Sequence, residues 1–264
     1  MNVVLLAGGL GTRLMEETTV RPKPMVEIGG RPILWHIMQL YVSQGFDDFF
    51  VALGYKGEAL KEYFLNQRLL SSDLRIDFAS ERVESLSARG PSWRVNLFDT
   101  GHDTLTGGRL LRLESRLRDQ GTFMLTYGDG LSDVDLSALL AFHRSHGRIA
   151  TVTAVRPPQR NRFLDCEGAS MAGFNEPVCT SWINGGFFVF EPEVFDYLTD
   201  DSTILEADAL VKIADDGELM AYQHEGFWQC MDNVQERDHL EALWRSGQAP
   251  WSKAGSKFVM ETAI

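Results

Sequence analysis

The sequence predicts an α/β fold with a doubly wound, mostly parallel sheet. Short apolar runs typical of strands buried on both faces recur along the chain, at residues 3–6, 48–53, 122–126, 150–155 and 183–190. Segments with helical spacing of apolar residues lie between them, at residues 32–44, 58–68 and 136–145. Strand and helix alternating with short joints form the βαβ pattern, which implies parallel strands and right-handed crossovers.

Length and composition restrict the function classes. The chain has 264 residues, enough for one large α/β domain, and is 44% hydrophobic and 23% charged. The net charge of −12 argues against an extended nucleic-acid surface but not against a nucleotide bound in a locally basic cleft. Cys166, Cys179 and Cys230 lack metal-like spacing and fit reduced thiols in a cytoplasm. No apolar run approaches the roughly 18 residues of a membrane helix, and the N-terminus leaves no room for a signal peptide.

The first strand ends in a glycine-rich loop. Gly8, Gly9 and Gly11 allow a sharp turn whose backbone N–H groups can cradle an anion. Thr12 adds a hydroxyl and Arg13 a forked cation suited to phosphate oxygens. These residues indicate a phosphate-binding loop, although an ordinary strand–turn–helix would need similar glycines.

Lys23 lies between two prolines, which stiffen its backbone. The dinucleotide fingerprint fits poorly, because Leu14 stands where its third glycine would be, and no Gly-Lys-Ser/Thr follows for a P-loop. In the next helix, residues 32–44, His36 lies within the apolar face, so we expect a core or interface residue and not a ligand. Gly45 is a plausible end to that helix.

The pattern of apolar and polar residues changes between residues 73 and 106. Period-two alternation predicts strands exposed on one side at residues 74–78 and 93–98, with a polar loop or excursion at 81–92. The segment 104–110 has the small residues of a helix entry. It fits either a ligand-lining turn or simply a helix start with Thr106 as N-cap, and the residues alone favour neither.

An acidic residue follows the strand at residues 122–126. Asp129, between Gly128 and Gly130, stands at the carboxyl end of that strand, where open α/β sheets bind ligands. The alternative is an ordinary Asp-Gly turn. Asp133 and Asp135 are typical of a turn and of an N-cap for the helix at residues 136–145. Further along, we expect a helix at 203–216, a short strand at 217–222 and a helix at 237–244.

The string Leu-Ala-Gly-Gly-x-Gly-Thr-Arg-Leu followed by Lys-Pro-Met resembles the signature of the sugar-1-phosphate nucleotidylyltransferases. The resemblance extends from residue 1 to about 251 and is closest to the cytidylyltransferase branch, through residues 26–38, 99–101 and 227–232. It implies a Rossmann-like nucleotidyltransferase fold over residues 1–264. The nucleotide-binding half would span about 1–130 and the acceptor-binding half about 131–245.

The resemblance also implies roles for individual residues. Arg13 would hold the leaving pyrophosphate, and Lys23 would reach the α-phosphate. Asp129 and Asp232 would bind Mg²⁺. The residues implied to line the nucleotide pocket are Leu6, Ala7, Gly8, Gly9, Gly11, Thr12, Thr104, Arg109 and Gly128.

The acceptor half departs from the family pattern. Arg160-Asn161-Arg162 replaces Arg-Phe-Gly, and Glu176 is followed by a proline where the family has a lysine. An acceptor phosphate buried without a cation would be costly, so we expect Arg162 or Arg160 to replace that lysine. Arg162 in place of a glycine would also fill volume near the sugar, and the segment before Ile183 is shorter than in the family, so we expect glucose 1-phosphate to be a poor acceptor. Asn184 corresponds to the asparagine that meets sugar hydroxyls in the family.

The resulting hypothesis is a magnesium-dependent, cytoplasmic cytidylyltransferase. It would transfer a cytidylyl group from CTP to a sugar 1-phosphate or a related phosphate or phosphonate, releasing pyrophosphate. No general base is needed, because the acceptor phosphate is already ionised. A thymidylyl- or uridylyltransferase and a catalytically silent nucleotide-binding paralogue are the alternatives. The family resemblance also implies a homo-oligomer, with no nucleic-acid or membrane partner.

Overall fold

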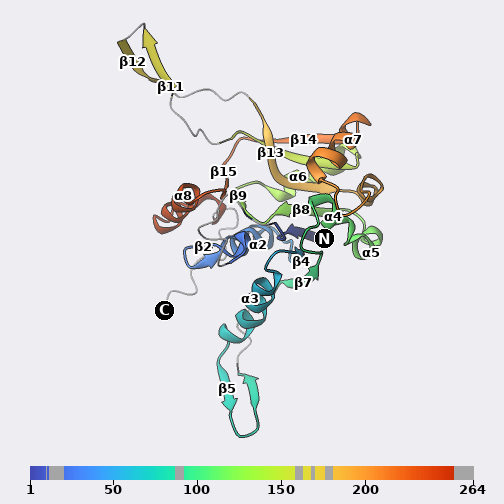
Figure 1. Cartoon of the computed structure of the whole chain (residues 1–264), viewed down its shortest axis with the longest axis vertical. Helices are drawn as coiled ribbons and strands as arrows, with labels where there is room; N and C mark the ends of the chain where they lie inside the picture. The colour runs from blue at the N-terminus through green and yellow to red at the C-terminus, as the bar shows by residue number, and fades with distance from the viewer. Residues whose placement is uncertain are drawn as a thin grey trace.

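The computed structural model describes residues 1–9, 11, 21–86, 92–157, 163–167, 170–175 and 181–252. Its centre is a seven-stranded sheet, whose strands stack from top to bottom in Figure 1. In spatial order they are β14 (Leu219–His224), β10 (Ala150–Val155), β13 (Ile183–Phe190), β8 (Phe123–Tyr127), β1 (Asn2–Leu6), β4 (Asp48–Leu53) and β7 (Arg94–Asp99). The expected α/β class is confirmed.

Strand direction decides where the site can form. β1 pairs in parallel with β4 and β8, β4 with β7, and β10 with β14. β13 alone runs antiparallel, to both β8 and β10. The carboxyl ends of β10, β8, β1, β4 and β7 therefore share one edge of the sheet, and β13 begins at that edge. The apolar run at 183–190 could not reveal this reversal, because a buried run reads alike in either direction.

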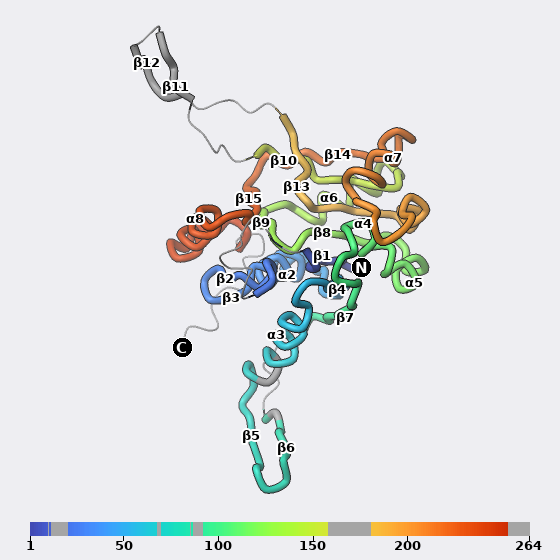
Figure 2. Tube along the Cα trace, in the orientation of Figure 1, coloured from blue at the N-terminus to red at the C-terminus, as the bar shows by residue number. Residues whose placement is uncertain are grey.

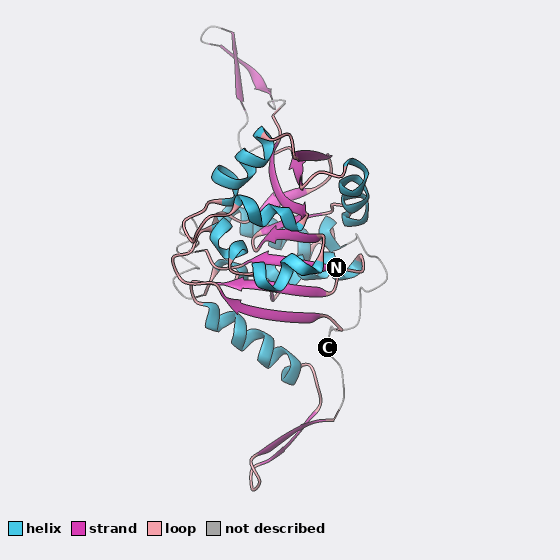
Figure 3. Cartoon of the chain, turned by 90° about the vertical axis from the view of Figure 1, so that its right-hand side faces the viewer, coloured by secondary structure: helices cyan, strands magenta, loops and turns pink. Residues whose placement is uncertain are grey.

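The sheet is covered on both faces, as a doubly wound fold requires (Figure 3). Val3 and Leu5 lie in one apolar cluster, while Val4 and Leu6 lie in another, because successive side chains of a strand point to opposite faces. The first cluster includes residues of α2 (Ile33–Ser43), α3 (Gly57–Leu70), α6 (Leu136–His146) and α8 (Val234–Arg245). The second includes residues of α4 (Thr106–Leu111), α5 (Glu114–Leu117), η4 (Pro192–Tyr197), η5 (Leu205–Ala209) and α7 (Leu210–Asp215).

Helix ends follow the expected chemistry in most places. The Asp135 carboxylate caps α6 by accepting from the Ala138 N–H at 2.8 Å, and Gly147 ends that helix with φ +63°. Asn233 caps α8 by accepting from the Glu236 N–H at 2.9 Å, so this helix begins three residues before the expected one. His36 is a core residue, as predicted, with 1% of its surface exposed and its Nε2 2.8 Å from the Ile28 carbonyl.

Four antiparallel two-stranded ribbons complete the described strands: β2 (Glu27–Ile28) with β3 (Arg31–Pro32), β5 (Leu74–Asp77) with β6 (Arg82–Ser85), β9 (Gly130–Ser132) with β15 (Trp228–Cys230), and β11 (Phe163–Glu167) with β12 (Ser170–Asn175). The β5–β6 ribbon projects away from the sheet (Figure 2). It replaces the loop expected over part of 81–92, because residues 82–85 pair with residues 74–77. The remaining short helical turns are η2 (Lys23–Met25), η3 (Arg118–Gln120) and η6 (Pro250–Ser252).

Two expectations for the helices near residues 106 and 206 need correction. The N-cap of α4 is Leu105, without a side-chain cap, and not Thr106. The Thr106 hydroxyl instead donates to Glu206 Oε2 at 2.8 Å and accepts from the Leu205 N–H at 2.9 Å. The helix expected at 203–216 starts as the π-helical turn η5 and becomes α-helical only at α7. In the described part of the chain, no helix has the length and apolarity needed to cross a bilayer.

Candidate active site

The site lies at the edge where the parallel strands end, as expected for an open α/β sheet. The loop after β1 is held between its two neighbours. The Ala7 N–H donates to the Ala52 carbonyl at 3.0 Å, and the Gly8 carbonyl accepts from the Tyr55 N–H at 3.1 Å. On the other side, the Gly128 N–H donates to the Leu6 carbonyl at 3.1 Å. The expected nucleotide-loop residues Leu6, Ala7, Gly8 and Gly128 therefore lie side by side.

Lys23 lies between two carboxylates. Its Nζ lies 2.6 Å from Asp129 Oδ2 and 2.7 Å from Asp232 Oδ1. Pro22 and Pro24 flank it in the η2 turn, where the Met25 N–H donates to the Pro22 carbonyl at 2.8 Å. The structure thus brings together three residues that the sequence singled out separately.

The β9–β15 ribbon explains how Asp129 and Asp232 meet. Gly130 pairs with Cys230 in its register, and the Met231 N–H donates to the Asp129 carbonyl at 2.9 Å. The Asp232 N–H donates to Glu236 Oε2 at 2.6 Å, which ties this carboxylate to the first turn of α8. Each acid is therefore fixed by backbone hydrogen bonds, and its side chain is directed at Lys23.

The electrostatics of this cluster are those of a partly enclosed ion triad. The Lys23 side chain is 12% exposed, and those of Asp129 and Asp232 are 30% and 20% exposed. Burial alone would lower the pKa of the Lys23 ammonium, but the two carboxylates outweigh it and raise the pKa above its ordinary value. Burial, followed by the charges of Asp232 and Glu236, raises the pKa of the neighbouring Cys230 thiol to about 12. Cys230 is therefore a protonated thiol near neutral pH.

Arg109 lies beneath the glycine loop rather than on its surface. The side chain is buried, with 4% of the residue exposed, and burial lowers the pKa of its guanidinium. Its two terminal nitrogens donate to the Gly8 carbonyl at 2.9 Å and to Thr100 Oγ1 at 2.9 Å. They also donate to three further carbonyls, those of Leu53, Gly101 and His102. Arg109 thus braces the loops after β1, β4 and β7, and its predicted contact with nucleotide stays a prediction.

Thr104 packs against the loop after β7 that Arg109 contacts, and it is also buried, with 6% of the residue exposed. A Cβ added at Gly101 would come within 2.7 Å of its Oγ1, so the loop after β7 packs directly on Thr104. Gly9 faces open space, because a Cβ built there would meet no heavy atom within 4 Å. Its predicted place in the nucleotide loop is sterically accessible.

Asn184 is the second residue of β13, at the same end of the sheet, next to residues that the sequence did not reveal. Its Nδ2 lies 3.4 Å from the Tyr127 hydroxyl, and the Tyr127 hydroxyl donates in turn to Glu206 Oε1. The indole N–H of Trp228 donates to the Gly185 carbonyl at 2.7 Å. A signal existed for Tyr127, which directly precedes Gly128 and Asp129, whereas nothing in the sequence pointed to Glu206.

Several predicted site residues lie outside the residues that the structure describes: Thr12, Arg13, Arg160, Arg162 and Glu176. Gly11 is described, with φ +63°, a value that favours glycine.

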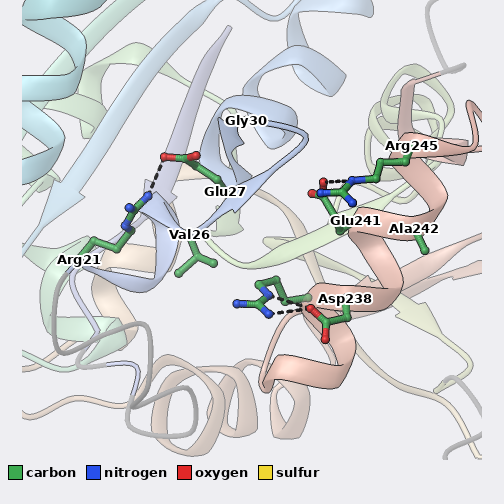
Figure 4. Close-up of a pocket in the computed structure, with 9 residues that line it drawn as sticks. Arg21, Val26, Glu27, Gly30, Asp238, Glu241, Ala242 and Arg245 are labelled. Carbon is green, nitrogen blue, oxygen red and sulfur yellow. Dashed lines mark hydrogen bonds and ion pairs between the residues drawn. The ribbon is translucent and has the colours of Figure 1, made fainter.

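A separate cavity of about 630 Å³ lies between the β2–β3 ribbon and α8 (Figure 4). Three arginines line it, and each has an acidic partner: Arg21 with Glu27, Arg237 with Asp238, and Arg245 with Glu241. Lys23, Asp129 and Asp232 do not line it. Because its charges are balanced in pairs, this cavity does not match the anion-binding character expected of a nucleotide site.

The fold and the site together define the class of protein. Residues 2–236 match the nucleotidyl transferase family model, and the chain therefore belongs to the nucleotidyl transferase family. It is an enzyme of the type that the sequence predicted.

Particular relatives narrow this assignment. The chain is 49% identical over 253 residues to the glucose-1-phosphate cytidylyltransferase of Salmonella typhi, covering 95% of this chain and 98% of that one. It is 42% identical to the probable glucose-1-phosphate cytidylyltransferase of Bacillus subtilis, covering 95% and 99%. Among solved structures, HddC from Yersinia pseudotuberculosis superposes with a TM-score of 0.69 at 20% identity, covering 92% and 99% of the two chains. That likeness bears on the fold alone.

Proposed function

We propose that the protein transfers a cytidylyl group from CTP to glucose 1-phosphate, releasing pyrophosphate. The observation that carries the proposal is the Lys23 ammonium between the Asp129 and Asp232 carboxylates, at the end of the sheet where the glycine loop begins. The 49% identity to a glucose-1-phosphate cytidylyltransferase over nearly the whole chain supports the choice of both substrates.

Mg²⁺ is the metal that the two carboxylates would hold. Both side chains reach the same ammonium, so both are close enough to face one cation, and that ammonium shows that the site accepts positive charge. Carboxylate oxygens are also the donors that Mg²⁺ prefers, whereas a thiol is a softer ligand that suits other metals. When bound, the ion would neutralise phosphate charge and orient the phosphate oxygens.

The chain's own groups have the remaining tasks. The backbone of the Gly8–Gly9 segment would cradle phosphates, and Arg13 would hold the departing pyrophosphate. Lys23 would place its ammonium on the α-phosphate. The acceptor phosphate, already ionised near neutral pH, attacks without a general base, so positioning and charge stabilisation carry the catalysis.

The similarity to known relatives and the residues of the acceptor half predict different acceptors. Arg160 and Arg162 motivate the expectation of an altered acceptor, whereas the identity to glucose-1-phosphate cytidylyltransferases favours glucose 1-phosphate. Glucose 1-phosphate is the better-supported acceptor, because the similarity to that relative spans 95% of the chain and the altered segment is short. In this proposal Arg162, or Arg160, grips the phosphate of glucose 1-phosphate in place of the family lysine, and Glu176 and Asn184 contact its sugar.

A screen of pyrophosphate release tests the proposal. CTP, UTP, dTTP and GTP are each combined with Mg²⁺ and a panel of sugar phosphates. We expect CTP with glucose 1-phosphate to be the most efficient pair. A higher kcat/KM with dTTP or UTP would assign a different donor, and binding of CTP without turnover of any acceptor would support the silent paralogue. The expected cytoplasmic location and homo-oligomer belong to the same proposal.

A further inference from the structure

Tyr127, the last residue of β8, is locked in place by its surroundings. Its ring packs on Gly186, where an added Cβ would lie 2.5 Å from Tyr127 Cδ2 and where φ is +78°. Only glycine suits that position, because both the space and the backbone conformation exclude a side chain. A tyrosine phenol carries its proton near neutral pH.

That proton points at Glu206. An ionised carboxylate only accepts hydrogen bonds, so Glu206 Oε1 fixes the Tyr127 O–H, while Oε2 fixes the Thr106 O–H at 2.8 Å. In the described part of the chain, no lysine or arginine forms an ion pair with Glu206. Glu206 lies in the η5 π-helical turn, a feature that is frequent at functional sites. Its carboxylate is thus occupied by hydroxyl donors from two different elements.

The Tyr127–Glu206 hydrogen bond also determines how the Asn184 amide is oriented. Because Tyr127 commits its proton to Glu206, its oxygen can only accept from Asn184, whose Nδ2 lies 3.4 Å away. At the other end of the same amide, Oδ1 accepts from the Gly186 N–H at 2.8 Å. Both contacts give the amide the same orientation, with nitrogen toward Tyr127. The second Nδ2 hydrogen takes no part in these two contacts, and Asn184 is exposed.

We propose that Tyr127 and Glu206 are positioning residues for the acceptor, which act by fixing the Asn184 amide as a hydrogen-bond donor to a sugar hydroxyl oxygen. This inference rests on the proposed function, in which Asn184 contacts the acceptor. The location agrees with it, since Tyr127 stands two residues before Asp129 and Asn184 is the second residue of the neighbouring strand, β13. Thr106 extends the same network into α4.

A mutant cycle with Tyr127→Phe and Asn184→Ala tests the inference. Phenylalanine keeps the ring on Gly186 and removes only the hydroxyl. We expect Tyr127→Phe to raise the KM for glucose 1-phosphate about five- to tenfold, with kcat and the KM for CTP within about twofold of wild type. In the Asn184→Ala background the same change should have no further effect, because Tyr127 acts through Asn184. Glu206→Gln should act in the same direction as Tyr127→Phe.

Tyr197→Phe is the matched control. The Tyr197 hydroxyl also donates to a carboxylate, Asp216 Oδ2 at 2.8 Å, but it lies in the η4 turn. This variant should leave every kinetic constant unchanged. An unchanged KM in Tyr127→Phe, or an equal rise with and without Asn184, would overturn the inference.

A second readout does not depend on turnover. The side-chain NH₂ signals of Asn184, assigned by their loss in Asn184→Ala, should shift in Tyr127→Phe and Glu206→Gln but not in Tyr197→Phe. If wild type does not use glucose 1-phosphate, the proposed function fails, and this measurement alone decides the inference. Asn184 signals that are indifferent to Tyr127 would overturn it.

Discussion

The Lys23 ammonium lies 2.6 Å from a carboxylate oxygen of Asp129, although 106 positions separate the two residues. The Asp232 carboxylate contacts the same ammonium from a third part of the chain. Lys23 therefore occupies the position between two acids that a divalent cation would also favour. Substituting the acids and substituting the lysine should therefore have different effects on metal binding.

Asp129→Asn and Asp232→Asn should each abolish most of the activity while leaving the fold intact. Losing one charge-stabilising contact in a dry site costs about 10²–10³ in rate, and losing a metal ligand should cost at least that. Turnover at saturating CTP and the melting temperature should be measured together. Asp135→Asn is the control, because asparagine caps a helix as well as aspartate does. Wild-type turnover of either site variant at limiting Mg²⁺ would remove that residue from the site.

Lys23→Gln should reduce turnover and strengthen metal binding in the absence of nucleotide. The ammonium competes with the metal for the same two carboxylates, so its removal should tighten Mn²⁺ binding by about threefold or more. Calorimetry with Mn²⁺, on wild type and variant at equal ionic strength, measures the effect. Weaker Mn²⁺ binding in the variant would show that Lys23 supports the metal site instead of competing with the ion.

Arg109→Lys should destabilise the fold by about 2–3 kcal/mol despite conserving the charge. A single ammonium cannot satisfy the carbonyls that the guanidinium fork reaches, and buried carbonyls without donors are costly. Urea unfolding quantifies the loss. The control is Arg112→Lys, because Arg112 pairs with Asp201 at the surface and should change stability by less than about 0.5 kcal/mol. Equal stability of the two variants would contradict the bracing role.

The stability of the protein should fall as the pH decreases from about 6.5 to 4, partly because of His36. Burial lowers the pKa of His36 to about 4, against the opposing effect of its hydrogen bond to the Ile28 carbonyl. Between these values the unfolded chain binds a proton that the folded chain does not, so the free energy of unfolding decreases by up to about 3 kcal/mol. Above pH 6.5 the effect is absent, because His36 is neutral in both states.

The difference in pH dependence between wild type and His36→Leu isolates this contribution, since all other titrating groups are common to both. Urea unfolding should be followed at pH 7.5, 6, 5 and 4. Parallel curves for the two proteins would show that His36 does not contribute.

The β5–β6 ribbon should mediate the expected self-association. Ile76, Phe78 and Val83 are 51%, 88% and 53% exposed, and an isolated two-stranded ribbon is only marginally stable in water. Phe78→Ser should lower the molar mass measured by light scattering. The activity of the resulting smaller species should be within about twofold of wild type. Glu81→Ser on the same ribbon is the control. A wild-type chain that is monomeric at micromolar concentration would refute the expectation.

Five of the seven sheet strands were predictable as compact apolar runs, and β4, β10 and β13 have the bounds expected for them. β7 was predicted from its alternating pattern, and β14 begins two residues after the strand expected at 217–222. Asp129 could be singled out because it follows a strand and lies between glycines, although its predicted metal role came from the family resemblance. Asp232 needed the family resemblance, since its partner ribbon β9–β15 forms only in the fold. The hydrogen bonds of Arg109 could not be predicted, because most of its acceptors are backbone carbonyls, which every residue carries. Tyr127 and Glu206 are 79 positions apart, and no local pattern joins them.

Arg109 also limits how this site can be redesigned. A Cβ at Gly8 would lie 2.4 Å from Arg109 Cζ, and one at Gly54 would lie 2.3 Å from Arg109 Nη1. The Arg109 side chain thus fills the space that is open because Gly8 and Gly54 have no side chains. A library that varies Gly8 or Gly54 singly would return mostly inactive clones, whereas one that varies the three codons together could reach solutions that no stepwise path passes through.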